Sequence, residues 1–336
     1  MLRSGRADGF LPHTAFWQRW AGWRRAPLYA TVGLRGNVAT ASIGPPVLPL
    51  AWELVAAASA DTDPAFVEEG LGPLAAHLDW LARERDPDGD GLLTILLPDE
   101  SGLDDSPKYD PVYGRMAHWR LHGYAALVQR CRRAEWDARA YCARWREHVE
   151  DVLVNVLYAL SLHAMARMSG EARFAARAQR VEQALVGKCL DPGTGLFYDL
   201  AGPDEEPVRV STWSSLAPLA LPGVGEDARR RLVEEHLLSA RRYRAPVGIP
   251  SVAMDEPSFK PGFDYWRCWR GPSWVNTAWL LTPALRELGY EAEAERILGS
   301  LRAAARTDGL REYYDPLTGR GLASRNFGWS TLLVDC

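Results

Sequence analysis

The strongest constraint on the fold of this chain is a contrast between neighbouring helical segments. Residues 151–168 are apolar on almost every side and are followed by Gly170, whereas residues 171–188 mix charged and apolar side chains. Residues 272–288, rich in Trp and Leu, and the charged residues 291–306 repeat this contrast. A helix that is apolar all round must be buried, and a helix with one apolar face covers it. We therefore expect inner helices that alternate with outer helices.

The turns after the outer helices resemble one another, because Asp, Gly and Pro recur in residues 86–92, 191–196 and 308–319. Another helix is expected to begin with Asp63 as its N-cap, followed by Pro64, and to stop near Arg85. Alternating strand patterns are nearly absent, which predicts an all-α protein. Helical hairpins that can bury their apolar faces only against their neighbours predict an (α/α) toroid.

Composition limits the class of protein and its partners. The 336-residue chain is 47% hydrophobic and 24% charged, as in soluble globular proteins, and no linker interrupts it, so we expect one domain over residues 1–336. The net charge of -4, with basic residues scattered among acidic ones, disfavours nucleic acid as a partner. The chain has neither a signal peptide nor an uncharged apolar run of about 18 residues, so we expect it to be cytoplasmic, without a membrane partner. Its five separated cysteines are typical of reduced thiols.

A loop between residues 98 and 110 crowds like charges. It holds five carboxylates, on Asp99, Glu100, Asp104, Asp105 and Asp110. Such crowding is expected to raise the pKa of at least one of them. From the residues alone, three interpretations are open: a solvated acidic loop, a cation site, or an acid/base site.

Aromatic and forked polar side chains are concentrated in residues 265–276. Trp269, Arg270, Trp274 and Asn276 suit sugar recognition, because rings cover the apolar face of a sugar while guanidinium and amide groups bind its hydroxyls. The alternative is the Trp-rich edge of a core.

A third cluster surrounds Glu312, which lies between an arginine and two tyrosines and is either a positioned base or a surface residue in a turn.

Two patterns that resemble metal sites fail at a required position. Residues 86–91 imitate the first half of a calcium loop, but its twelfth position is Leu97 rather than Glu, so we expect a tight Asp/Gly turn. Asp104-Asp105 opens a magnesium-binding DDxxD motif, but Lys108 stands at its fifth position. We expect no metal and no cofactor.

In this order, the segments resemble glycoside hydrolase family 63, most closely its bacterial mannosylglycerate and glucosylglycerate hydrolase group, and more distantly the trehalases. The resemblance covers about residues 9–329, with Gly9-Phe-Leu-Pro-His13 among its segments, and is carried by DPDGDGL, ESGLD, GIPS, WRGP and EYYDP. It implies an (α/α)6 barrel and an inverting mechanism. Because relatives place a helical hairpin before that segment, the barrel is expected to be complete or to lack its first hairpin.

The resemblance also implies roles for individual residues. Asp104 matches the general acid and Glu312 the general base. The sugar subsite is implied to comprise Tyr109, Asp110, Trp269, Arg270, Trp274, Asn276, Tyr313 and Trp329. Two departures bear on the substrate: Asp105 stands where many relatives have Asn, and Cys268 stands where Tyr-Trp usually precedes the Arg-Gly motif.

We therefore expect an inverting glycoside hydrolase of a small α-linked glycoside. Such an enzyme needs two carboxyl groups about 6.5–9.5 Å apart, with water between them. Asp104 must stay protonated, which crowding by Asp105 and Asp110 would favour. The alternatives are a trehalase-like hydrolase, a non-catalytic sugar-binding or scaffold protein derived from such a barrel, and an epimerase or lyase, which lacks an obvious His pair. The sugar, the aglycone and the oligomeric state do not follow from the sequence.

Overall fold

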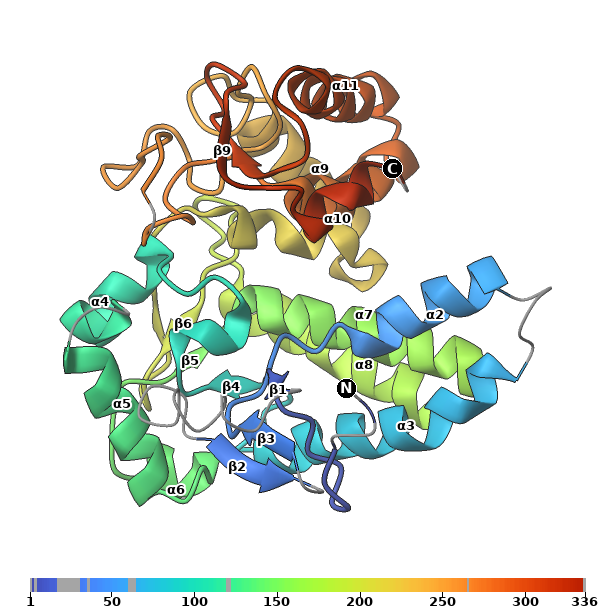
Figure 1. The fold of residues 1–336 in the computed structure, drawn as a ribbon, viewed down its shortest axis with the longest axis vertical. Helices are drawn as coiled ribbons and strands as arrows, with labels where there is room; N and C mark the ends of the chain where they lie inside the picture. The colour runs from blue at the N-terminus through green and yellow to red at the C-terminus, as the bar shows by residue number, and fades with distance from the viewer. Residues whose placement is uncertain are drawn as a thin grey trace. The chain divides into compact units, whose positions relative to one another are not determined.

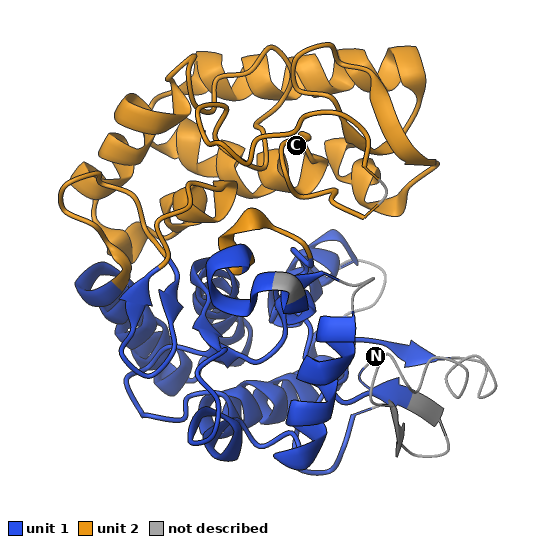
Figure 2. Cartoon of the chain, turned by 90° about the vertical axis from the view of Figure 1, so that its left-hand side faces the viewer, with its two compact units in different colours: residues 1–104, 110–188, 199–207 blue, residues 105–109, 189–198, 208–336 orange. Residues whose placement is uncertain are grey.

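The structure is a computed structural model whose contacts divide the chain into two compact units, shown in Figure 2. Unit 1 comprises residues 1–104, 110–188 and 199–207, and unit 2 comprises residues 105–109, 189–198 and 208–336. The described residues are 2, 5–16, 31–34, 37–59, 65–118, 122–264 and 266–334. The single domain expected from the sequence stays a prediction.

Unit 1 is built mainly from helices (Figure 1). They are α2 (Leu48–Ser59), α3 (Phe66–Glu84), α4 (Asp110–Tyr113), α5 (His122–Arg133), α6 (Ala138–Cys142), α7 (Val152–Ser169) and α8 (Ala172–Ala184). Helices α2, α3 and α8 all pack against α7. The inner position expected for residues 151–168 is therefore confirmed, and so is the half-exposed position of the helix that follows, which buries Phe174, Ala178, Val181 and Glu182.

Local signals set both ends of α7. The Asp151 carboxylate accepts the Val154 N–H at 3.0 Å as an N-cap, and Gly170 ends the helix in the left-handed conformation at φ 72°. By length and composition alone α7 could cross a membrane, but much of it is buried inside the protein. That burial is typical of the core helix of a soluble protein.

Small antiparallel sheets, too short to leave a pattern in the sequence, connect the helices of unit 1. One has the order β1 (Ala15–Phe16), β3 (Asn37–Thr40), β2 (Thr31–Leu34); the other runs in order through β4 (Thr94–Ile95), β5 (Val149–Glu150), β6 (Leu200–Ala201) and β7 (Glu206–Pro207). Buried Asn155 of α7 bonds the backbone of Leu93 in both directions, at 2.7 and 3.0 Å. This contact fixes the chain just before β4 and the acidic loop.

Unit 2 repeats the inner and outer arrangement. Its longer elements are α9 (Glu226–Arg231), α10 (Val275–Glu287), α11 (Glu291–Asp308) and the hairpin of β8 (Arg311–Tyr314) with β9 (Gly321–Arg325). Helix α11 packs on α10 with Ala294, Ile297, Leu298 and Leu301, at the spacing of one helical face. Its opposite face carries exposed charges, as expected for an outer helix.

The start of α10 differs from the expected one. The segment was expected to be helical from Pro272, but the helix begins at Val275. Ser273 is extended instead, because its N–H donates to the Tyr314 carbonyl at 2.8 Å and its own carbonyl accepts the Tyr314 N–H at 2.9 Å. This bridge ties the start of α10 to β8.

Two further expectations concern helix α3 and the cysteines. Helix α3 ends at Glu84, with Arg85 as its C-cap, as predicted, whereas the expected start at Asp63 and Pro64 lies outside the described residues. The cysteines that the structure describes are all free thiols, which confirms the prediction for them. Cys336 and Tyr265 also lie outside the described residues.

Gly170→Ala tests the role of the glycine at the end of α7. A Cβ at this position would meet no atom within 4 Å, so the cost is purely that of a left-handed backbone. We expect a loss of about 1–2 kcal/mol in the free energy of unfolding, measured by chemical denaturation. Gly187→Ala is the control, because this helical glycine has equal space and no positive φ, and it should be neutral or stabilising. An equal loss in both variants would contradict the argument.

Candidate functional site

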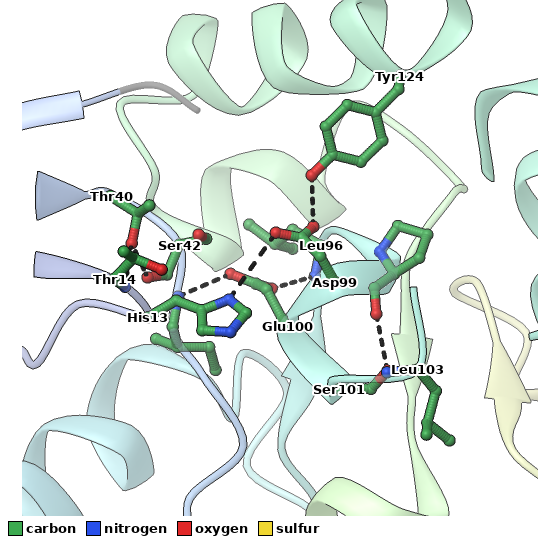
Figure 3. Close-up of polar contacts among 12 residues, drawn as sticks. His13, Thr14, Thr40, Ser42, Leu96, Asp99, Glu100, Ser101, Leu103 and Tyr124 are labelled. Atoms are coloured by element: carbon green, nitrogen blue, oxygen red, sulfur yellow. Dashed lines mark hydrogen bonds and ion pairs between the residues drawn. The ribbon is translucent and has the colours of Figure 1, made fainter. Parts of the chain in front are cut away.

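Glu100 is the anchor of the acidic loop. Its fully buried carboxylate accepts two hydrogen bonds from the Arg85 guanidinium, at 2.7 and 2.9 Å. It also accepts the backbone N–H of Leu96 at 2.8 Å and that of Ile43 at 3.2 Å (Figure 3). These hydrogen bonds satisfy both oxygens and offset the cost of burying the charge. Glu100 therefore holds the loop in place.

Asp99, in the 3-10 turn Pro98–Ser101, has a different environment from the adjacent Glu100. It is 3% exposed, and its Oδ1 accepts a hydrogen bond from the Tyr124 hydroxyl at 2.6 Å. Its Oδ2 lies 4.0 Å from Nδ1 of His13 (Figure 3). Burial raises the pKa of Asp99 to about 7, and the charges of Asp104 and Glu100 act in the same direction. The expected pKa increase within the crowded loop is thus confirmed, with burial as its main cause.

The remaining carboxylates of the loop have separate surroundings. Asp104 is half-buried in the turn after Leu103. Asp105 is buried in unit 2, where it accepts the Trp269 N–H at 3.4 Å and lies 3.9 Å from the Cys268 thiol. In unit 1, Asp110 lies 3.9 Å from Nε2 of His118. The two departures from the family pattern, Asp105 and Cys268, therefore contact each other.

The aromatic side chains of unit 2 form one stack. The rings of Trp269 and Trp274 lie 3.9 Å apart at 11°, and Tyr313 packs on Trp274 at 4.9 Å. Trp329 lies 5.8 Å from Trp274 and is 46% exposed, whereas Trp269 and Trp274 are each 3% exposed. The alternative of a core edge thus describes the two inner rings, and Trp329 presents the open face of the stack.

Three other predicted subsite residues also belong to unit 2. Arg270 is 5% exposed and follows Trp269 directly, and its carbonyl accepts the Lys260 N–H at 2.6 Å. Asn276 is half-buried in the first turn of α10. Tyr109 is fully buried, with the Lys108 ammonium 5.1 Å from its ring centre. Tyr109 therefore supports the loop within unit 2.

Glu312 lies on β8, in the hairpin joined to α10 by the Ser273–Tyr314 bridge. Its carboxylate is half-buried and accepts the Ser324 N–H of β9 at 3.2 Å. The next residue, Tyr313, is in the aromatic stack, and its hydroxyl donates to the Asp264 carbonyl at 3.4 Å. Burial raises the pKa of Tyr313, so its hydroxyl stays protonated. Within unit 2, Glu312 thus lies in a fixed hairpin, directly before Tyr313 of the aromatic stack.

A group of four carboxylates elsewhere in unit 1 has the spacing of a cation site. Oxygens of Asp88, Asp90, Glu150 and Glu205 all lie within 4.8 Å of one another. The Lys188 ammonium bonds Asp90, lies 2.7 Å from Glu205 and 3.9 Å from Glu150. Burial raises the pKa of Glu150 to about 8, with a further contribution from Asp90. The group therefore contains its own cation, and the expectation of no metal stays a prediction.

The loop that contributes two of these carboxylates is the expected tight turn. Asp86 accepts the N–H groups of Gly89 at 2.7 Å and Gly91 at 3.1 Å, and Asp90 accepts that of Leu92 at 2.8 Å. Side chains that bond their own backbone in this way are typical of Asp/Gly turns. The interpretation as a turn is confirmed.

Reasoning from the sequence missed His13, Tyr124 and Trp213. His13 and Tyr124 face Asp99 from segments far away in the chain, so no local pattern connects them to the acidic loop. Trp213, buried in the 3-10 segment Trp213–Ala220, extends the stack at 6.5 Å from Trp269. A lone tryptophan in an apolar segment is indistinguishable from a core residue by sequence.

Each unit contains helices and a half-buried carboxylate, Asp104 in unit 1 and Glu312 in unit 2. Glycoside hydrolases use a pair of Asp or Glu side chains, so these features favour the class of helical glycoside hydrolases. The family model described as "Mannosylglycerate hydrolase MGH1-like glycoside hydrolase domain" matches residues 1–330. The chain belongs to this family, and it is a glycoside hydrolase.

Individual relatives agree with this assignment. Mannosylglycerate hydrolase of Rubrobacter radiotolerans is 33% identical over 303 residues, which is 80% of this chain and 67% of that protein. Glucosylglycerate hydrolase of Mycolicibacterium hassiacum is 24% identical, over 99% of this chain and 84% of that protein. The crystal structure of the GH63 mannosylglycerate hydrolase from Thermus thermophilus in complex with glucose has a TM-score of 0.84 at 27% identity, covering 99% of this chain and 84% of that one. These likenesses confirm the predicted family and the (α/α)6 fold class.

Arg85→Met tests the anchor of the acidic loop. The substitution leaves the Glu100 charge buried and without its guanidinium, so we expect a loss of about 3–5 kcal/mol in the free energy of unfolding. Arg83→Met is the matched control two residues earlier, because the side chains of Arg83 and Glu84 are 54% and 36% exposed, and should cost less than about 1 kcal/mol. Chemical denaturation measures both, and similar losses would show that the buried pair is not the anchor.

Proposed function

We propose that this chain is an inverting hydrolase of a small α-linked glycoside, with mannosylglycerate or glucosylglycerate as first candidates. Asp104 is the general acid and Glu312 the general base. The substrate class is supported by the names of the two relatives, one a mannosylglycerate and the other a glucosylglycerate hydrolase. A trehalase-like activity on a short α-glucoside is the second candidate within the same mechanism.

The observation that carries the assignment of the acid is the construction of the loop around Asp104. Glu100 and Arg85 are wholly buried and fix the loop, whereas Asp104 keeps access to solvent. A general acid needs this combination, because it must be held rigidly and still reach the leaving oxygen. The proton passes from Asp104 to the glycosidic oxygen as the bond to the anomeric carbon breaks.

Glu312 is the matching choice for the base. Water must be deprotonated as it attacks the anomeric carbon from the opposite face of the sugar, and a carboxylate performs this step in inverting enzymes. Ser324 holds the Glu312 carboxylate by its backbone N–H, which limits the rotamers of the side chain. Asp110, Tyr109 and Asn276 are assigned to the same subsite on the family resemblance.

The aromatic stack and Arg270 are assigned to the sugar. Trp329 offers an exposed ring to the apolar face of a pyranose, with the buried rings of Trp269 and Trp274 behind it. The guanidinium of Arg270 supplies forked donors to hydroxyl or carboxylate groups. Two carboxyl groups and water account for the whole reaction, so the mechanism requires no cofactor or metal. A cytoplasmic location, with no nucleic-acid or membrane partner, remains a prediction.

Asp104→Asn and Glu312→Gln should each remove most of the turnover of mannosylglycerate, glucosylglycerate, trehalose or another α-glucoside, while the fold is retained. Each role needs a carboxyl group that can exchange a proton. Glu295→Gln, on the outer helix α11, is the control and should leave kcat/KM unchanged. Full activity of Glu312→Gln would place the base elsewhere, and binding of sugar without turnover in the unmodified protein would favour a non-catalytic role.

Proton NMR during the first turnovers tests the stereochemistry of the reaction. An α-linked substrate should release the β-anomer before mutarotation mixes the two forms, because water attacks opposite the leaving group. Early appearance of the α-anomer would mean a retaining mechanism and a carboxyl separation of only about 5 Å.

Arg270→Lys tests the sugar subsite, since it keeps the positive charge but loses the planar fork. We expect kcat/KM to fall about tenfold or more, together with the affinity for substrate. Arg302→Lys on α11 is the matched control and should have no effect. An unchanged kcat/KM in Arg270→Lys would assign Arg270 to the structure alone.

A further inference from the structure

The chain directly after the candidate acid is buried in unit 2. Residues 105–109 follow Asp104 and belong to unit 2, which is orange in Figure 2. All five are buried, and Asp105 and Lys108 are each only 2% exposed, whereas Asp104 itself is half-buried. The segment ends in the 3-10 turn Pro107–Tyr109. A short, wholly buried segment therefore lies immediately behind the residue that is proposed to donate the proton.

Lys108 makes a side-chain contact within unit 2. Its ammonium donates to the Ser214 hydroxyl at 3.1 Å and lies 5.1 Å from the centre of the Tyr109 ring. Ser214 is 1% exposed and belongs to the 3-10 segment that begins at Trp213 and packs against α10. The ring of Trp213 lies 6.5 Å from that of Trp269. Lys108 thus binds the residue next to one ring of the aromatic stack.

Asp105 holds the other end of the segment. Its carboxylate accepts the Trp269 N–H at 3.4 Å and lies 3.9 Å from the Cys268 thiol. The Cys268 carbonyl in turn accepts the indole N–H of Trp274 at 3.1 Å. Both ends of the segment are therefore attached to the parts of unit 2 that carry the aromatic stack.

The charge of Lys108 is not explained by core packing. Lysine is among the residues least often buried completely, because its ammonium loses hydration when it leaves water. An apolar side chain of similar length would fill the same space without that cost. An ammonium can instead hold a hydroxyl group in one place, since it carries three donors. The contact with Ser214 therefore points to a requirement for position rather than for stability.

We propose that Lys108 and Ser214 are positioning residues for the general acid. Their contact holds residues 105–109, limits how far the main chain at Asp104 can move, and so keeps its carboxyl group within reach of the glycosidic oxygen. Proton transfer needs a donor within hydrogen-bond reach, and a displacement of about 1 Å can cost about a hundredfold in rate. This inference rests on the proposed role of Asp104. It adds two residues that neither touch the substrate nor exchange a proton with it.

The leaving group separates this role from a general structural one. Glycerate or a second sugar leaves readily only when Asp104 protonates the glycosidic oxygen as the bond to the anomeric carbon breaks. In an α-glycosyl fluoride, the fluoride ion leaves with the electron pair of the carbon–fluorine bond and needs no proton from the enzyme. Both substrates need Glu312 to deprotonate the attacking water. A displaced acid therefore slows the glycoside and spares the fluoride.

Ser214→Ala removes the contact with little change in volume. We expect kcat to fall about tenfold or more, with KM changed by less than about twofold, on the glycoside that the unmodified protein turns over: mannosylglycerate, glucosylglycerate or trehalose. On the α-fluoride of the same sugar, kcat should be nearly unchanged. Ser215→Ala is the control, because Ser215 is the next buried residue of the same 3-10 segment, and it should leave turnover of both substrates unaffected.

Lys108→Met and the double variant test whether the effect comes from this one contact. Lys108→Met should show the same selective loss on the glycoside. Adding Ser214→Ala to it should lower kcat little further, because the contact can be lost only once. Losses that add in the double variant would mean that the two side chains act separately, and would overturn the inference. If Lys108→Met does not fold, Ser214→Ala alone decides.

The inference and the proposed acid fail in different ways. Asp104→Asn is the reference, since it should abolish turnover of the glycoside and retain turnover of the fluoride. An equal loss on both substrates in Asp104→Asn would reject the proposed acid. A selective loss in Asp104→Asn, with no loss in Ser214→Ala or an equal loss on both substrates in that variant, would reject only the positioning role.

Discussion

The buried carboxylate of Glu100 is the interaction on which the acidic loop depends. Its two oxygens bind the guanidinium of Arg85 at the end of α3, the backbone of Leu96 after β4, and the backbone of Ile43. Partners from 4 to 57 residues away in the sequence thus meet at one charge. Because a buried ion is stable only when each of its lone pairs is satisfied, the geometry of these partners is strictly constrained. That constraint explains how a short loop rich in charge can present Asp104 in one position.

In unit 2, backbone hydrogen bonds and ring packing hold the hairpin that carries Glu312. The Ser273–Tyr314 bridge fixes the β8 hairpin against the start of α10, and the rings of Trp269 and Tyr313 both pack on Trp274. The bridge uses backbone groups that would otherwise remain unpaired before the helix begins. The late start of α10 is therefore part of the construction that holds Glu312, and a longer helix would remove it.

The sequence predicted well what depends on local signals. The ends of α7 follow from Asp151 and Gly170, and the contrast between inner and outer helices follows from apolar periodicity. It could not predict contacts made over long separations. The pairing of Ser273 with Tyr314 moved the start of α10, and His13 meets Asp99 only through the folded chain. The residue roles at the site came from the family resemblance, since spacing alone left the acidic loop open to three interpretations.

Asp99 and Glu100 illustrate why residue type is a weak guide to ionisation in this loop. They are adjacent, both are carboxylic acids, and both are almost completely buried. Arg85 and two backbone N–H groups surround Glu100, whereas Asp99 has a hydroxyl group and a half-buried imidazole beside it. Burial without a cation favours the neutral acid, and burial with a bidentate guanidinium favours the ion. Glu100 is thereby held in place by its ion pair with Arg85, whereas burial raises the pKa of its neighbour Asp99.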